Sequence, residues 1–207
     1  MPLPNTDLTA DTALIVIDMQ NGFCHPDGSF ASIGLDVSRP LAAADGCATL
    51  VDAARAAGIP VIWTRYVYRP DYTDGGLLVT DLLPAIKDIR SLEDGTWDAE
   101  ILQQLVPADD EVVIDKNRYS AFYGTRLEPV LTSRGIRNLV LCGVTTNMCV
   151  ETTARDASQR DYRTVVVGDA SAEFDPARHE HALFTIGFGF GWVAEQADVL
   201  GAWEQGA

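Results

Sequence analysis

Residues 139–160 read LVLCGVTTNMCVETTARDASQR and carry the clearest structural signal in the sequence. Their first six residues form an apolar run of strand length and β-branched composition. The next three, TTN, are residue types that cap helices, and the segment that follows is typical of a helix. Cys149 would then lie in the first helical turn, where unpaired N–H groups and a partial positive charge lower a thiol's pKa and offer donors to an oxyanion. The alternative is an ordinary buried free cysteine.

Strand and helix patterns alternate along the rest of the chain. Apolar runs predict strands at 12–18, 60–66, 112–116, 138–143, 164–169 and, shorter, 190–193. Helices are predicted at 39–57, 97–106, 125–134, 146–161, 176–186 and after residue 195. This alternation predicts an α/β fold, a doubly wound, mostly parallel six-stranded sheet with helices on both faces, in which residues 1–207 form one domain. Residues 1–10 are expected to form a short arm, and the irregular stretch 67–95 is expected to close in part over a pocket.

Composition limits the classes of partner. The chain has 207 residues, is 47% hydrophobic and 22% charged, and carries a formal net charge of −15. This charge argues against nucleic acid and anionic membranes, because both are bound through clustered Lys and Arg. No apolar run approaches the ~20 residues that span a bilayer, and the N-terminus lacks the features of a signal peptide. The four cysteines have neither disulfide nor zinc spacing, so a reducing cytoplasm is the expected location.

Three strands end in, or just before, a reactive side chain. Asp18 follows the first strand, Lys116 ends the third and Cys149 lies just beyond the fourth. Each has a common structural explanation: an aspartate in a turn, a solvated lysine, a core cysteine. Parallel strands, however, bring their carboxyl ends to one edge of the sheet, where ligands bind. There Asp18 can accept the thiol proton, Lys116 can stabilise anions and Cys149 can attack a carbonyl.

These motifs identify a resemblance that covers nearly the whole chain. The sequences IDMQNGF at 17–23, DKNRYSAFYGTRLEPVLTSRGI at 115–136 and GVTTNMCVETTARDA at 143–157 resemble the isochorismatase-like superfamily of cysteine hydrolases. Among its members they look most like the ureidoacrylate and biuret type amidohydrolases. The resemblance implies a catalytic triad matched by Asp18, Lys116 and Cys149. It also implies a cis peptide between Val144 and Thr145, which would turn the Thr145 N–H toward the oxyanion beside that of Cys149. A homodimer or homotetramer is expected on the same grounds.

Departures from the family narrow the chemistry. Nicotinamidases in this superfamily hold a metal with an Asp-x-His pair after the second strand and a further His. Here residues 63–76 read WTRYVYRPDYTDGG, without histidine, so neither a metal nor another cofactor is expected and nicotinamide is a poor substrate guess. True isochorismatases lack the cysteine, so Cys149 favours C–N cleavage.

Residues near the three strand ends are candidates for binding the substrate. For each, core packing, loop capping or solvation is the ordinary alternative. The candidates are Gln20, Phe23, Trp63, Tyr68, Arg69, Tyr119 and Phe122.

The sequence thus predicts a metal-independent cysteine amidohydrolase. It would cleave a C–N bond of a small amide, ureido or carbamoyl compound with water, through a covalent thioester or thiocarbamate. A nicotinamidase-like amidase and a catalytically silent ligand-binding member of the fold are the alternatives. A dinucleotide- or flavin-binding domain would need a glycine-rich turn after the first strand, and a redox thiol protein would need C-x-x-C.

Overall fold

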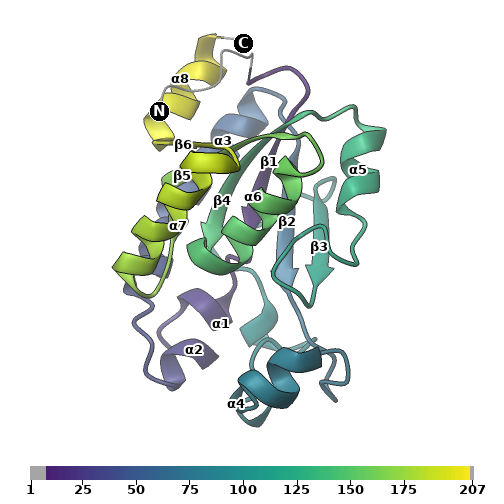
Figure 1. The fold of residues 1–207 in the computed structure, drawn as a ribbon, viewed down its shortest axis with the longest axis vertical. Helices are drawn as coiled ribbons and strands as arrows, with labels where there is room; N and C mark the ends of the chain where they lie inside the picture. The colour runs from purple at the N-terminus through teal and green to yellow at the C-terminus, as the bar shows by residue number, and fades with distance from the viewer. Residues whose placement is uncertain (1–7, 206–207) are drawn as a thin grey trace.

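The structure is a computed structural model that describes residues 8–205. Its centre is a six-stranded, all-parallel sheet with strand order β3-β2-β1-β4-β5-β6 (Figure 1). The strands are β1 Thr12–Ile17, β2 Val61–Tyr66, β3 Val112–Lys116, β4 Asn138–Val144, β5 Arg163–Ala172 and β6 Trp192–Ala194. Every residue of β1 and β4 is buried, as continuous apolar runs require when helices cover both faces. The predicted doubly wound α/β sheet is confirmed.

Four longer helices cover the sheet. On one face α3 Ser38–Ala56 packs against α8 Gln196–Gln205, and on the other α6 Glu151–Ser158 packs against α7 Pro176–Gly189 (Figure 1). The helix α5 Leu127–Ser133 connects β3 to β4. Asp175 caps α7 as its sequence predicts, since its carboxylate accepts the N–H groups of Ala177 and Arg178 at 2.8 and 3.2 Å. Within residues 8–205 no helix has both the length and the apolar character to cross a membrane.

Short helical segments gather at the carboxyl ends of the strands, toward which the strand arrows point in Figure 1. They are α1 Asn21–Cys24, α2 Ser29–Ser32, α4 Ala85–Asp88, the π-helical turns η1 Leu78–Leu82 and η3 Thr146–Val150, and the 3₁₀ turn η2 Trp97–Ala99. The stretch 67–95 therefore has some helical structure of its own. The arm expected at residues 1–10 lies mostly outside the described residues.

The prediction of a helix at 97–106 is wrong. Only the turn η2 is helical there, because beyond this turn backbone hydrogen bonds to residues 19–21 after β1 interrupt the helical series. The Asn21 N–H donates to Glu100 O at 2.9 Å, and the Leu102 N–H donates to Met19 O at 2.9 Å. An apolar periodicity in this segment thus reflects packing beneath a loop and not a helix.

Strand order reverses between β1 and β4, and this is where ligands bind in such sheets. Ile17 and Gly143 are partners in this pair of strands. A Cβ on Gly143 would lie 2.1 Å from Ile17 O, and the residue's φ is +114°, so only glycine fits. The close contact holds the ends of β1 and β4 side by side just before the residues that carry the chemistry.

Candidate active site

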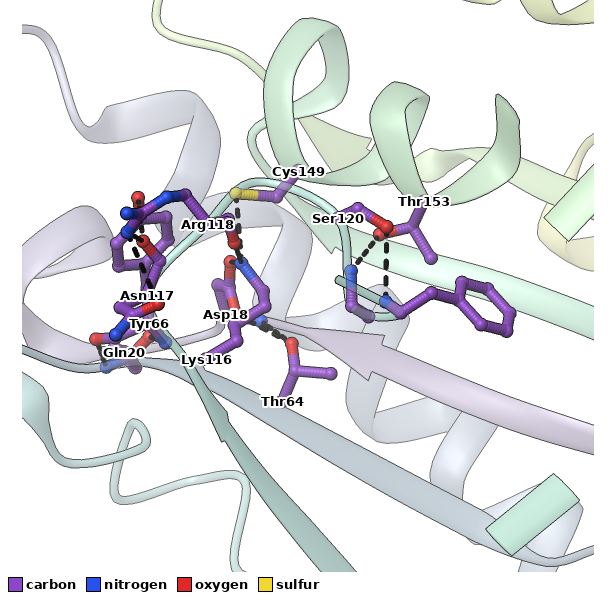
Figure 2. A network of polar contacts seen from close by, with 12 residues as sticks. Asp18, Gln20, Thr64, Tyr66, Lys116, Asn117, Arg118, Ser120, Cys149 and Thr153 are labelled. Atoms are coloured by element: carbon purple, nitrogen blue, oxygen red, sulfur yellow. Dashed lines mark hydrogen bonds and ion pairs between the residues drawn. The ribbon is translucent and has the colours of Figure 1, made fainter. Parts of the chain in front are cut away.

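Asp18, Lys116 and Cys149 converge at the carboxyl edge of the sheet (Figure 2). Lys116 Nζ lies 2.6 Å from Asp18 Oδ2 and 3.3 Å from Cys149 Sγ. The side chains of Asp18 and Lys116 are fully buried, and Cys149 is 3% exposed. Three groups that are remote in the sequence are thus in direct contact, with the ammonium between the carboxylate and the sulfur.

Neighbouring side chains fix the orientation of this cluster. Thr64 Oγ1 donates a hydrogen bond to Asp18 Oδ1 at 2.6 Å, which leaves Oδ2 to Lys116. Lys116 Nζ lies 4.4 Å from the centroid of the Tyr66 ring at the end of β2 and donates to Arg118 O at 3.1 Å. Lys116 on β3 therefore reaches past the end of β2, the strand between them, to contact Asp18 after β1.

The loop after β3 is tied to α6 near Cys149. The Ala121 N–H donates to Thr153 Oγ1 at 3.0 Å, and the Ser120 hydroxyl bonds to the Asp156 carboxylate. These bonds join the segment that follows Lys116 to the helix that follows Cys149.

Burial determines the charge state of the cluster. Burial alone would lower the pKa of Lys116, but the adjacent Asp18 carboxylate and Cys149 sulfur outweigh it, so the pKa is raised and Lys116 is an ammonium. Burial raises the pKa of the Cys149 thiol; Lys116 opposes this rise and Asp18 adds to it. The sulfur therefore rests as a thiol at neutral pH.

This result corrects the expectation that a helix N-terminus lowers the pKa of Cys149. The cysteine lies in the π-helical turn η3, and α6 begins only at Glu151. Loss of solvent around the sulfur outweighs the nearby positive charge of Lys116. A base must therefore remove the proton before or during attack.

The peptide bond between Val144 and Thr145 is cis, at the position that the family resemblance implies. It connects the end of β4 to η3. Thr145 and Cys149 both face a cavity that adjoins the cluster.

That cavity has a volume of about 180 Å³. Most of its wall is aromatic or aliphatic, and the loop 67–95 supplies one side of it. The lining residues are Phe23, Phe30, Leu35, Tyr66, Tyr68, Leu78, Leu83, Ile86, Leu92, Tyr119, Thr145, Asn147, Met148, Cys149, Glu173, Phe174 and Arg178. A small molecule would fit beside the sulfur, against apolar walls and the few polar groups of the cavity.

Residues 12–198 match the model of the isochorismatase domain family. The chain belongs to the isochorismatase-like hydrolase family. Among its curated relatives, the ureidoacrylate amidohydrolase RutB of Azorhizobium caulinodans is 35% identical over 99% of this chain and 95% of its own length. The ureidoacrylate amidohydrolase RutB of Methylorubrum extorquens is 40% identical over 90% of this chain and 80% of its own length.

Solved structures of the family share the fold. A cysteine hydrolase from Pseudomonas syringae pv. phaseolicola superposes with a TM-score of 0.89 at 33% identity, over 100% of this chain and 99% of its own. The N-carbamoylsarcosine amidase of Thermoplasma acidophilum gives a TM-score of 0.71 at 27% identity, over 89% of this chain and 96% of its own. The chain of 207 residues is, like the two RutB proteins, an amidohydrolase, a hydrolase of C–N bonds other than peptide bonds.

Of the seven candidate substrate-binding residues, the structure places Phe23, Tyr68 and Tyr119 on the cavity wall of the amidohydrolase. Trp63 instead lies in the core, where its Nε1–H donates to Glu111 Oε2 at 2.7 Å. Arg69 is exposed and pairs with Asp71 at 3.4 Å.

Gln20 and Phe122 also lie away from the cavity. The Gln20 amide is saturated by the backbone, because it donates to Tyr66 O and Ala99 O at 2.9 Å and accepts from the Tyr66 N–H at 2.7 Å. It therefore clamps the loop after β1 to the end of β2. The Phe122 ring packs against Tyr162, 5.8 Å between centroids.

Sequence reasoning missed several wall residues of this amidohydrolase. Tyr66 ends β2, so the argument from strand ends that found Asp18 and Lys116 would have found it as well. Glu173 was missed because β5 continues to Ala172, beyond the predicted strand end at residue 169. Arg178, in the first turn of α7, carries no such signal, because only the packing of α7 on the sheet brings it to the cavity.

Proposed function

We propose that this protein is a cysteine-dependent, metal-independent amidohydrolase that cleaves a small ureido or carbamoyl compound, or a related amide, through a covalent intermediate. The observation that carries the proposal is the position of Lys116 Nζ, 2.6 Å from Asp18 Oδ2 and 3.3 Å from Cys149 Sγ, beside a cavity. A thiol, a base and a cation in contact are the parts that nucleophilic acyl transfer requires. Similarity to two ureidoacrylate amidohydrolases supports a ureido substrate.

The first step forms a C–S bond. Asp18 accepts the thiol proton while the sulfur of Cys149 attacks the substrate carbonyl carbon, and Lys116 stabilises the negative charge that passes between them. The backbone N–H groups of Thr145 and Cys149 hold the oxyanion; one such donor contributes roughly 3–4 kcal/mol in comparable sites. A thiol with a raised pKa suits this order, since the thiolate forms only when a substrate is present to react.

The two products leave in separate steps. Protonated Asp18 gives its proton to the leaving nitrogen as the C–N bond breaks, leaving a thioester or thiocarbamate on Cys149. Asp18 then accepts a proton from water, whose oxygen attacks the same carbon; as the C–S bond breaks, Asp18 returns this proton to the sulfur and the thiol is restored. Atoms and charges balance with water as the only co-substrate.

The cavity favours a small planar acid. Aromatic rings such as Tyr66 and Tyr119 would stack on a planar substrate, and Arg178 supplies a cation to a wall that is mostly apolar. A substrate carboxylate would pair with this arginine. Arg178, and not the sequence candidate Arg69, would therefore be the arginine that binds the substrate.

The decisive experiment is a substrate screen with matched variants. Ammonia release would be measured from ureidoacrylate, biuret, N-carbamoyl amino acids, maleamate and nicotinamide, with ureidoacrylate expected to react fastest. Cys149→Ala and Cys149→Ser should abolish turnover, whereas Cys47→Ala, which removes another buried thiol outside the cavity, should retain it. Dialysis against a chelator should leave the rate unchanged. Substantial activity in Cys149→Ala, or none in the wild type on any compound, would refute the proposal.

A further inference from the structure

Glu173 is a buried carboxyl group on the wall of the catalytic cavity that the proposed mechanism leaves unused. It follows the last residue of β5, Ala172, which pairs with Val144 at the end of β4. This register places Glu173 beside the segment that leads to Cys149. Glu173 is 2% exposed and lines the same cavity as Thr145 and Cys149.

The two oxygens of Glu173 differ in their bonding. Oε1 accepts the Phe174 N–H at 3.1 Å. Oε2 is buried and, within residues 8–205, makes no hydrogen bond of normal geometry, although the Thr145 hydroxyl and the Asn147 N–H lie near the carboxyl group. A buried carboxylate oxygen without a donor is destabilising, because the hydrogen bonds it made to water in the unfolded chain are not replaced. An N–H donor on a molecule in the cavity would replace them.

The protein surroundings of Glu173 disfavour its charged form. Burial raises the pKa of Glu173 above its ordinary value, although the Thr145 hydroxyl, the N–H groups of Phe174 and Asn147 and the charge of Arg178 act against this rise. A further N–H donor from a ligand would stabilise the charged form in the same way. A carboxylate can only accept hydrogen bonds, so it selects ligand groups that donate.

We propose that Glu173 is a specificity-determining residue whose Oε2 accepts an N–H from the amino group that stays bonded to the scissile carbonyl carbon. This inference rests on the proposed function and narrows its substrate class to carbamoyl compounds, R–NH–CO–NH₂, over acyl amides, R–NH–CO–CH₃. The amino group is not broken off when Cys149 attacks. It remains on the thiocarbamate, H₂N–CO–S–Cys149, so one contact serves both halves of the reaction.

The preference for carbamoyl compounds over acyl amides follows from the free-energy cost of leaving Glu173 Oε2 without a hydrogen-bond donor. A methyl in place of the amino group would bury Oε2 against carbon and leave it without a donor. Sites built to bond a substrate N–H or O–H reject analogues that lack it by large factors. Selection for the carbamoyl group would run against intrinsic reactivity, since the second nitrogen of a urea makes its carbonyl less electrophilic than that of an amide.

The test compares ureidoacrylate with acetamidoacrylate, which differ only in this group, by loss of substrate on chromatography. In the wild type, kcat/KM for ureidoacrylate should exceed that for acetamidoacrylate by about 100-fold or more. Glu173→Gln keeps the shape of the side chain. The amide oxygen of the variant can still accept the Phe174 N–H, so its NH₂ group would face the amino group of the substrate, donor against donor. The variant should lower kcat/KM for ureidoacrylate by about 100-fold and change that for acetamidoacrylate by less than about threefold.

A matched control lies two residues away. Ser171 Oγ is also buried without a partner within the described residues, but Ser171 does not line the cavity, so Ser171→Ala should leave the ratio of the two kcat/KM values unchanged. Equal losses on both substrates in Glu173→Gln would overturn the inference. If that variant fails to fold, the wild-type ratio decides: a ratio near one overturns the inference, and a large one that Ser171→Ala preserves supports it.

The outcomes separate this inference from the proposed function. Cysteine-dependent cleavage of acyl amides with no preference for carbamoyl compounds would leave the amidohydrolase mechanism standing and refute the role of Glu173. Carbamoyl hydrolysis that survives Cys149→Ala would refute the mechanism instead, whatever Glu173→Gln does.

Discussion

The ammonium of Lys116 and the carboxylate of Asp18 lie 2.6 Å apart in the interior, although β2 separates the strands that carry them. Both side chains are fully buried, so each charge depends on the other for compensation. Loss of either charge alone would therefore leave the other buried and uncompensated.

Removing one member of this pair should be more harmful than removing both. Lys116→Met would leave a buried, uncompensated carboxylate and lower the free energy of unfolding by about 3–5 kcal/mol, whereas adding Asp18→Asn should recover part of that loss. Urea denaturation of the single and double variants measures both quantities. The control is Arg65→Met, which breaks an ion pair with Asp115 that is partly exposed and should cost about 0–1 kcal/mol. A double variant no more stable than Lys116→Met would contradict this account.

The resting sulfur of Cys149 should be protonated at neutral pH. Because burial raises the pKa of this thiol, the thiolate should appear only above the ordinary thiol pKa of about 8.5. The measurement is the ultraviolet absorbance of the thiolate, taken as the difference between the wild type and Cys149→Ala during a pH titration. A full thiolate signal near pH 7 would show that Lys116 outweighs burial and that Asp18 is not needed as a base.

Two glycines with positive φ should respond very differently to alanine. Gly58 (φ +68°) ends α3 with open space around its would-be Cβ, so Gly58→Ala should cost about 1–2 kcal/mol from backbone strain alone. Gly143→Ala would add a Cβ 2.1 Å from Ile17 O and should cost more than about 4 kcal/mol or prevent folding. Thermal denaturation of both variants compares them directly. Equal losses would mean that β1 and β4 can move apart without consequence.

Glu111 should contribute stability that is lost in acid. Burial acts to raise its pKa, but Arg55, the Ala108 N–H and the Trp63 indole outweigh burial and lower it. A group whose pKa is lowered by folding stabilises the protein above its unfolded pKa, about 4.3, and this stabilisation disappears as the pH falls through the folded value.

Glu111→Gln should therefore lower the free energy of unfolding near pH 7 by about 1–3 kcal/mol and have little effect near pH 3. Urea denaturation at both pH values measures the difference. Glu180→Gln, at an exposed position on α7, serves as the control and should be neutral at both. A loss of equal size at the two pH values would show that the amide itself, and not the charge, disturbs the structure.

The sheet could be predicted because its signals are local. Continuous apolar runs identified the six strands to within a few residues, and the Asp175-Pro176 pair marked the start of α7. The exception at 97–106 has a physical reason, since backbone bonds to the loop after β1 replaced the helical ones. Periodicity in a short segment does not distinguish a helix from a strip packed beneath another loop.

The sequence by itself determined the α/β fold, the family and the three residues at the strand ends, because hydrophobic period and residue type act over short distances. Only the tertiary structure decided that burial raises the pKa of the Cys149 thiol, that Gln20 and Trp63 serve the scaffold, and that Glu173 and Arg178 line the cavity. These properties depend on solvent exclusion and on how helices and loops pack across the sheet, which no local stretch of sequence specifies.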